Sequence, residues 1–338
     1  MISLSRPLLI ALLLLLCTAP CDARRRHGVS ADSLTRLKTE KIYRHIDSNY
    51  VHKPLPKLTV RMRSSFSGGA LYSSYKLTDG TKNTANLHSD LNHTLSAGVS
   101  YKGIGVSVAF NPARVFGYTD MEYNLTSYGP RFGGELNYFN STSYSGYASL
   151  SGEKTDFPSN SFTQNMLTGS FYFVFSHSRF SYPAALNQMF VQKRSKGTWL
   201  LALSFAAGNI RADGETASEY LSLKRNSLFQ LGIGGGYAYN WVLPHQWLLH
   251  LSITPTISIW EKFDATYADE ADTGDDKDKR IKWPGAIITT RASFIHNFGK
   301  TWFAGLTFVS NSTLTTDDPY FAFYFKWRAR IVVGVRVW

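Results

Sequence analysis

The feature that most constrains this chain is an alternation of apolar residues along its last segment. Every second position from 321 to 337 is apolar, from Phe321 through Trp327 to Val337. Because successive side chains of a strand point to opposite faces, this pattern predicts one long strand with an apolar face. The interleaved positions of the same segment include the cations Lys326, Arg328, Arg330 and Arg336.

The same period of two recurs along most of the chain, most clearly over residues 229–241 and 247–259. Alternation alone does not separate a soluble sandwich from a membrane barrel, because either can present one apolar face. Strand length separates these two folds. The segments are 226–241, 246–262 and 319–338, and each exceeds the roughly 3–10 residues usual in soluble strands. Aromatic residues such as Trp241, Trp247 and Trp302 lie near the ends of the apolar faces, as in membrane-interface girdles. We therefore predict an all-β fold, an antiparallel transmembrane β-barrel.

The pattern yields a set of candidate strands, which are 57–66, 92–101, 103–110, 119–128, 131–140, 143–152, 163–176, 196–209, 226–241, 246–262, 284–297, 301–312 and 319–338. Single-chain bacterial barrels have an even number of strands. The region 57–90 is ambiguous, with 69–78 a further strand or 57–66 none. We predict about 12 strands, with 14 as the alternative, and both chain termini in the periplasm. The same parity places 263–283 outside the cell and 177–195 on the periplasmic side or inside the lumen.

The N-terminus has the pattern of an export signal. The apolar run 7–17 follows Arg6 and is shorter than the about 20 residues of a membrane-spanning helix. Small residues at Cys21 and Ala23 predict cleavage after Ala23, so that 1–23 is a signal peptide, 24–56 a periplasmic leader and 57–338 the barrel. Both cysteines, Cys17 and Cys21, lie before this cut, which leaves no disulfide in the mature chain.

The net charge of +12 indicates anionic partners. For an exported chain we expect outer-membrane lipid and lipopolysaccharide, together with the barrel-assembly machinery, and not nucleic acid. We further expect a monomer in the bacterial outer membrane.

The face opposite the apolar one carries the candidate ligand residues. These are Arg291, Lys326, Arg328, Arg330, Arg336 and His250, with Arg61, Arg63, Arg131 and the acid Glu135 on the same face. If the apolar face meets lipid, the cations point into the barrel, where guanidinium groups match phosphate or carboxylate geometry. The alternative is a packed lumen in which these cations pair with acids or with the 177–195 insert.

The insert at 177–195 interrupts the strand pattern. Pro183 followed by small residues predicts a helix start. The segment is rich in polar side chains, and we predict a plug or constriction formed by His177, Arg179, Tyr182, Gln188, Gln192 and Lys193. The alternative is an ordinary structural loop.

One pair of residues suggests an enzymatic function. His250 and Ser252 share a strand face, yet same-face neighbours are about 6.6 Å apart along a strand, so a catalytic pair needs a group from another strand. We assign no catalytic residue. The loop 269–280 departs from a calcium-binding loop at Ala271, Thr273 and Arg280, and we predict no metal or cofactor.

Several segments together resemble a domain-of-unknown-function family (number 4421) of Bacteroidota envelope proteins. They are DSNYV at 47–51, GVSYKGIGVS at 98–107, YFVF at 172–175, RFSYPAA at 179–185 and QKRSKGT at 192–198. The resemblance implies an outer-membrane barrel of unassigned activity and supplies no catalytic residues. We expect a protein that binds or passes small anionic or polar solutes, or serves a structural role. The alternative is a barrel-embedded enzyme for lipid hydrolysis or lipid A modification.

Overall fold

The computed structural model describes residues 45–52, 58–76, 82–101, 104–110, 121–150, 152–212, 223–267, 285–299, 301–317 and 320–337. The chain divides into two compact units, 1–45 and 46–338, and the account below concerns the second. The predicted signal peptide, most of the leader and the loop 268–283 lie outside the described residues. Within the described ranges, no helix has both the length and the apolar character needed to cross a membrane.

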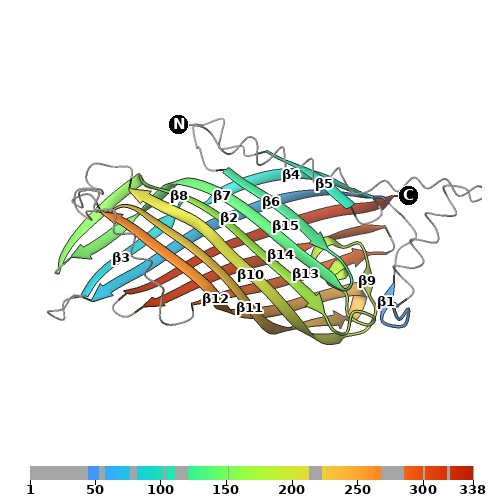
Figure 1. Cartoon of the computed structure of the whole chain (residues 1–338). Helices are drawn as coiled ribbons and strands as arrows, with labels where there is room; N and C mark the ends of the chain where they lie inside the picture. Colours follow the sequence, from blue (N-terminus) through green and yellow to red (C-terminus); the bar gives the residue numbers. More distant parts are fainter. Residues whose placement is uncertain are drawn as a thin grey trace, which may run out of the picture. The chain divides into compact units, whose positions relative to one another are not determined.

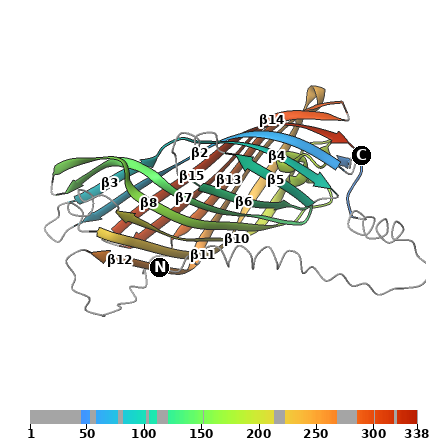
Figure 2. The same cartoon turned by 90° about the horizontal axis from the view of Figure 1, so that it is seen from above.

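The second unit is an antiparallel sheet that closes on itself, so the predicted barrel fold is confirmed (Figures 1 and 2). Around the ring lie β2 (Leu58–Lys76), β3 (Lys82–Ser89), β7 (Phe132–Leu150), β8 (Glu153–Val174), β10 (Lys196–Ala212), β11 (Leu223–Leu243), β12 (Trp247–Tyr267), β13 (Ala286–Phe298), β14 (Trp302–Asp317) and β15 (Tyr320–Val337). β15 pairs back with β2, with Val337 opposite Leu58. Closure satisfies the backbone groups that an open sheet edge would leave unpaired.

Three short strands lie at one end of the barrel. We call this end, where Leu58 and Val337 lie, the proximal end, and the opposite one the distal end. β4 (Asn92–Tyr101) continues β3 and pairs with the first half of β2, β5 (Ile104–Phe110) pairs with β4, and β6 (Met121–Tyr128) pairs with β7. Within the described residues the sheet has thirteen strands, or twelve if β3 and β4 are counted as one interrupted strand, and no pairing between β5 and β6 is among its contacts.

The predicted strand boundaries need correction in the N-terminal half. The ranges 57–66 and 69–78 fall on one strand, β2, and the ranges 131–140 and 143–152 merge into β7. β3 at 82–89 was not predicted. In β7 the pairing with β8 shifts between Ser141 and Gly146, and Gly146 has a φ of 152°. Such a bulge reverses the phase of the alternation, which makes one strand resemble two.

The two faces of the sheet differ as the alternation predicts. On β12, Ile253 is 51% exposed, whereas the neighbouring Thr254 is fully buried. On β15, Ile331 and Val333 are exposed while Arg328 and Arg336 are buried. Apolar side chains therefore cover the outside, and among the most exposed are Trp199, Leu201, Leu203, Ile233, Leu251, Ile257, Ile259, Trp260 and Leu306.

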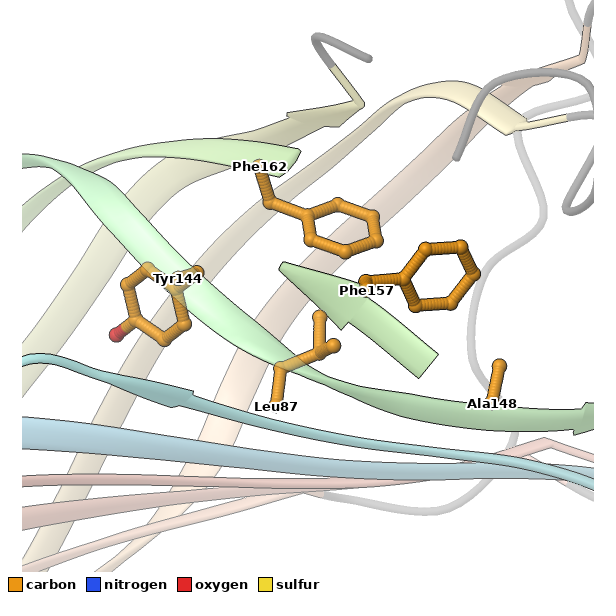
Figure 3. Packing of buried hydrophobic residues seen from close by; sticks show 5 residues of the cluster. All are labelled: Leu87, Tyr144, Ala148, Phe157 and Phe162. Carbon is orange, nitrogen blue, oxygen red and sulfur yellow. The ribbon is translucent and has the colours of Figure 1, made fainter. Parts of the chain in front are cut away.

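Apolar side chains also fill part of the barrel interior. A cluster of Leu87, Tyr144, Ala148, Phe157 and Phe162 joins β3, β7 and β8, and Figure 3 shows it in close view. The rings of Phe157 and Phe162 meet edge to face, with 5.4 Å between their centroids. A second cluster of Phe139, Met166, Ala206, Ile287 and Tyr324 spans β7, β8, β10, β13 and β15. The lumen is therefore largely filled with side chains at this level.

Candidate functional site

A buried ion pair crosses the lumen. Arg291 on β13 and Glu135 on β7 come from opposite sides of the ring, and both side chains are fully buried. Arg291 donates from Nε to Glu135 Oε1 at 2.7 Å and from Nη2 to Ser170 Oγ at 3.1 Å. Its guanidinium carbon also lies 5.5 Å from the centroid of the Tyr172 ring. A buried charge is tolerated only with such partners, so this pair fixes one side of the barrel against the other.

A second basic group, Arg328 on β15, is paired through its terminal nitrogens with acid and amide oxygens. Its Nη1 donates to Glu122 Oε1 at 2.6 Å and also contacts the Asn124 side-chain oxygen, while Nη2 donates to Asn137 Oδ1 at 3.1 Å. Ser67 donates a hydrogen bond of 2.6 Å to the other oxygen of Glu122. Arg328 therefore belongs to a paired network rather than to an open cationic surface.

Two further arginines differ from Arg291 and Arg328 because neither is paired within the described ranges. Arg63 on β2 and Arg330 on β15 form neither a hydrogen bond nor an ion pair in the part of the chain that the structure describes. Arg330 is opposite Ser65 in the β2–β15 register, one same-face step from Arg63, and both are only partly buried. Arg330 lies within electrostatic range of the cations Arg63 and Arg328 and of the acid Glu122, which is itself ion-paired with Arg328. Among the described residues, Arg63 and Arg330 are therefore neighbouring cations without an ion pair of their own.

His250 on β12 lies in a separate polar network. Its Nδ1 is 2.7 Å from Asn240 Oδ1 on β11, and its Nε2 is 3.3 Å from Ser252 Oγ. All three side chains are almost completely buried. The prediction that strand spacing keeps His250 and Ser252 out of hydrogen-bond reach is wrong, because their side chains approach to 3.3 Å.

The segment between β8 and β10 enters the barrel at its proximal end. Its one-turn helix η2 (Pro183–Asn187) contacts β6, β12 and β13, which only a segment inside the ring can do. Pro183 is the first helical residue, as predicted. The ring of Tyr182 lies 4.5 Å from that of Tyr172 and 5.2 Å from that of His250, between centroids. Burial raises the pKa of the Tyr182 phenol above its ordinary value, so the side chain enters the lumen uncharged.

Polar side chains of the barrel wall hold the backbone of this segment. Arg61 Nη1 donates to the Asn187 carbonyl at 3.1 Å, and Arg336 Nε donates to the Gln188 carbonyl at 3.0 Å. Asn240 Nδ2 donates to the Ser181 carbonyl and to Gln192 Oε1, both at 3.1 Å. The two arginines therefore act as ligands of the insert.

Residues 47–52, which we call the clasp, contact the insert from its other side. β1 (Val51–His52) pairs with β9 (Val191–Gln192) of the insert. Asp47 forms an ion pair of 3.2 Å with Arg179, and Lys193 Nζ donates to the Ser48 carbonyl at 2.9 Å. The part of the predicted leader that the structure describes thus continues into the barrel unit.

The predicted site residues separate into groups. Three of the predicted ligand residues lie in lumenal networks, namely Arg291, Arg328 and His250. Arg336 holds the insert, and Arg330 forms no hydrogen bond or ion pair among the described residues. The Lys326 ammonium lies 4.5 Å from the centroid of the Phe139 ring. Of the predicted plug residues, Tyr182, Gln188 and Gln192 are buried, Arg179 and Lys193 are exposed, and His177 is partly buried. The structure therefore does not bring all six residues together inside the lumen.

Sequence reasoning missed the partners of these cations, which are the acid Glu122, the amides Asn124 and Asn137 and the hydroxyl of Ser170. Their positions in the alternation identify the lumenal face, but pairing across a ring depends on closure. In the described part of the chain, no group of three or more His, Cys, Asp or Glu side chains could hold a metal ion.

These features define a class: a closed antiparallel barrel whose lumen holds charged networks and an inserted segment. The chain belongs to the family described as domain of unknown function DUF4421, whose model matches residues 45–336. A search of curated proteins gives no match.

Solved structures with a related architecture are distant. The outer membrane protease OmpT of Escherichia coli has 7% sequence identity and a TM-score of 0.38, covering 83% of this chain and 96% of that one. The outer membrane protein OprG of Pseudomonas aeruginosa has 13% identity and a TM-score of 0.28, covering 84% and 96%. At these values neither activity nor residue roles transfer to this chain.

Proposed function

We propose that this protein is an outer-membrane β-barrel whose basic lumen binds a small anion. The membrane location is supported by the apolar outer face, which includes Ile253, Ile257, Ile331 and Val333. Exposing such a surface to water costs about 25 cal/mol per Å², whereas acyl chains cover it without that cost. Outer-membrane lipid and lipopolysaccharide are the proposed surroundings, and the barrel-assembly machinery is the proposed means of insertion for a monomeric barrel.

The proposed topology follows from placing the barrel in the outer membrane. Residues 1–23 are the proposed signal peptide and 24–56 a periplasmic leader, so the proximal end faces the periplasm. The proposed plug is the 177–195 insert, supported by the contacts of η2 with opposite walls of the barrel.

The single observation that carries anion binding is the pair Arg63 and Arg330. Like charges side by side in a partly desolvated lumen repel each other, and an anion between them removes that cost. The planar donor fork of a guanidinium suits phosphate, sulfate or carboxylate oxygens. Arg61 and Arg328, whose own groups are engaged by the insert and by Glu122, enclose this position with further positive charge.

The test uses the full chain refolded in detergent micelles and titrated with inorganic phosphate or sulfate. A ligand that binds only the folded state raises the melting temperature, by an amount that grows with its concentration. We expect this rise in the wild type and its loss in the Arg63→Gln/Arg330→Gln double variant. The exposed Arg131 provides the matched control, because Arg131→Gln leaves the lumen unchanged. An equal rise in wild type and double variant would exclude the proposed site.

Planar-bilayer recording distinguishes binding from passage. With the insert across the proximal end, we expect no sustained current from the wild-type protein. A sustained anion-selective current would instead identify the basic lumen as an open pore.

A further inference from the structure

We propose that Ser252, His250 and Asn240 form a covered serine-nucleophile site for carboxylic esters at the proximal end of the lumen. The inference is independent of the anion site, since it uses other side chains on β11 and β12. The three side chains form a chain of contacts, from Ser252 to His250 and from His250 to Asn240.

The hydrogen bonds orient the imidazole as a general base. Asn240 Nδ2 is committed to the insert, which turns its carbonyl oxygen toward His250 Nδ1 at 2.7 Å. Because an amide oxygen only accepts, Nδ1 must carry the proton, and the unprotonated Nε2 faces Ser252 Oγ at 3.3 Å. This is the order nucleophile, base and orienting group that activates a serine. Asn240 is the positioning residue.

The cationic hydrogen-bond donor Arg291 lies beside the proposed nucleophile, Ser252. Arg291 on β13 is directly opposite Ser252 in the β12–β13 register, and its Nη1 is 3.5 Å from Thr254 Oγ1 on the same wall. A fixed guanidinium at this position suits the negative oxygen that develops when an ester carbonyl is attacked. Since Glu135 already holds Arg291 in place, no reorganisation is needed at that moment.

The insert covers the site and indicates the kind of substrate. Phe180 and Tyr182 place their ring centroids 6.1 Å and 5.2 Å from that of His250. Phe180, Leu186 and Phe190 are buried in the same segment. Displacing the Tyr182 ring alone, with the insert backbone still bound to Asn240, would open a space next to Ser252 that Phe180 still lines, which fits the acyl part of an ester.

The proposed reaction is ordinary acyl transfer. Ser252 Oγ attacks the carbonyl carbon while its proton passes to His250 Nε2, and the bond from that carbon to the leaving alkoxy oxygen breaks as this oxygen takes the proton. Water then attacks the acyl-serine ester with the same proton transfers, which returns free Ser252 and a carboxylic acid.

The test is labelling of the full chain in detergent micelles by a fluorophosphonate probe, with the modified residue located by mass spectrometry. We expect slow modification of Ser252 in the wild type. Tyr182→Ala should label about tenfold faster, because removing the ring uncovers His250 and Ser252 while the insert still holds Asn240. His250→Gln should label at least about 100-fold more slowly through loss of the general base. Folding of each variant is checked by its mobility on unheated gels.

The chain offers a matched control serine. Ser293 on β13 is buried and directly opposite His250 in register, but its hydroxyl has no hydrogen-bond partner. Ser293→Ala should therefore keep the wild-type labelling, whereas Ser252→Ala should lose it. Asn240→Ala should lose labelling, because nothing then accepts a hydrogen bond from His250 Nδ1. Asn240→Asp should retain it, because the carboxylate accepts that hydrogen bond. Absence of a Ser252 adduct in both the wild type and folded Tyr182→Ala overturns the proposal.

Discussion

The wall from β10 to β15 and the wall from β2 to β7 are built differently. In the first, four of the five pairings run without a register shift and β11–β12 shifts only in its distal half, at 223–225 and 231–232, while the lumenal side of β12 carries the small residues Ser252, Thr254 and Thr256. In the second, β3 and β4 are interrupted, β7 is bulged, and large side chains such as Glu135 and Tyr144 point inward. One wall is thus a regular surface, and the other supplies much of the material that fills the lumen.

The largest effect is expected where the two walls are tied together. Glu135→Ala leaves Arg291 buried without its counter-ion, which should lower the free energy of unfolding by about 3–5 kcal/mol. Urea unfolding in lipid vesicles, followed by tryptophan fluorescence, measures the loss. The double variant Glu135→Leu/Arg291→Met removes both charges and should recover most of it. A loss as large in the double variant would show that the pair is not the tie between the walls.

A somewhat smaller effect is expected on the outer face of the regular wall. Val333→Arg places a charge on the proposed lipid face and should cost about 2–4 kcal/mol near mid-depth. The yield of vesicle-inserted, heat-modifiable barrel is the measurement. The control, Arg330→Ala on the lumenal face of the same strand, should leave assembly intact. The reverse ranking would mean that the faces are assigned the wrong way round.

Adding a single methyl group at the bulge of the irregular wall should destabilise that wall. Gly146 has a φ of 152°, and a Cβ there would collide with the Asn86 carbonyl oxygen. Gly146→Ala should therefore destabilise the β3–β7 pairing by about 1–3 kcal/mol. Hydrogen exchange of β3 amides reports this change locally. Gly235→Ala, on the exposed face of β11, is the counterpart in the regular wall and should alter stability by about 0.5 kcal/mol or less.

The smallest effect is expected at the clasp, residues 47–52. The Arg179 side chain of the Asp47 ion pair is 53% exposed, so Asp47→Ala should cost only about 0.2–1 kcal/mol, less at high salt. Thermal unfolding at low and high salt checks this. Asp156→Ala breaks a more exposed pair with Lys154 in the distal half of β8 and should change little. A large loss at Asp47 would mean that the clasp, rather than lumenal contacts, holds the insert.

The same contrast explains which predictions succeeded. In the regular wall the alternation indicated the strands and the face of each residue, as for Ile253 and Thr254, because residue parity is preserved along an unbroken strand. In β7 the bulge changes parity, so one strand was predicted as two. The candidate cations were found on the lumenal face, but their partners were not, since Glu122 and Arg328 are 206 positions apart in the chain.

The sequence by itself determined the antiparallel sheet, its two faces and the start of the insert helix at Pro183, because these depend on the steric preferences of neighbouring residues. Only the tertiary structure decided that the insert lies in the lumen, that Glu135 pairs with Arg291 and that Asn240 orients His250. These contacts join strands that are distant in sequence. Ring closure and register set their distances, and no local pattern encodes either.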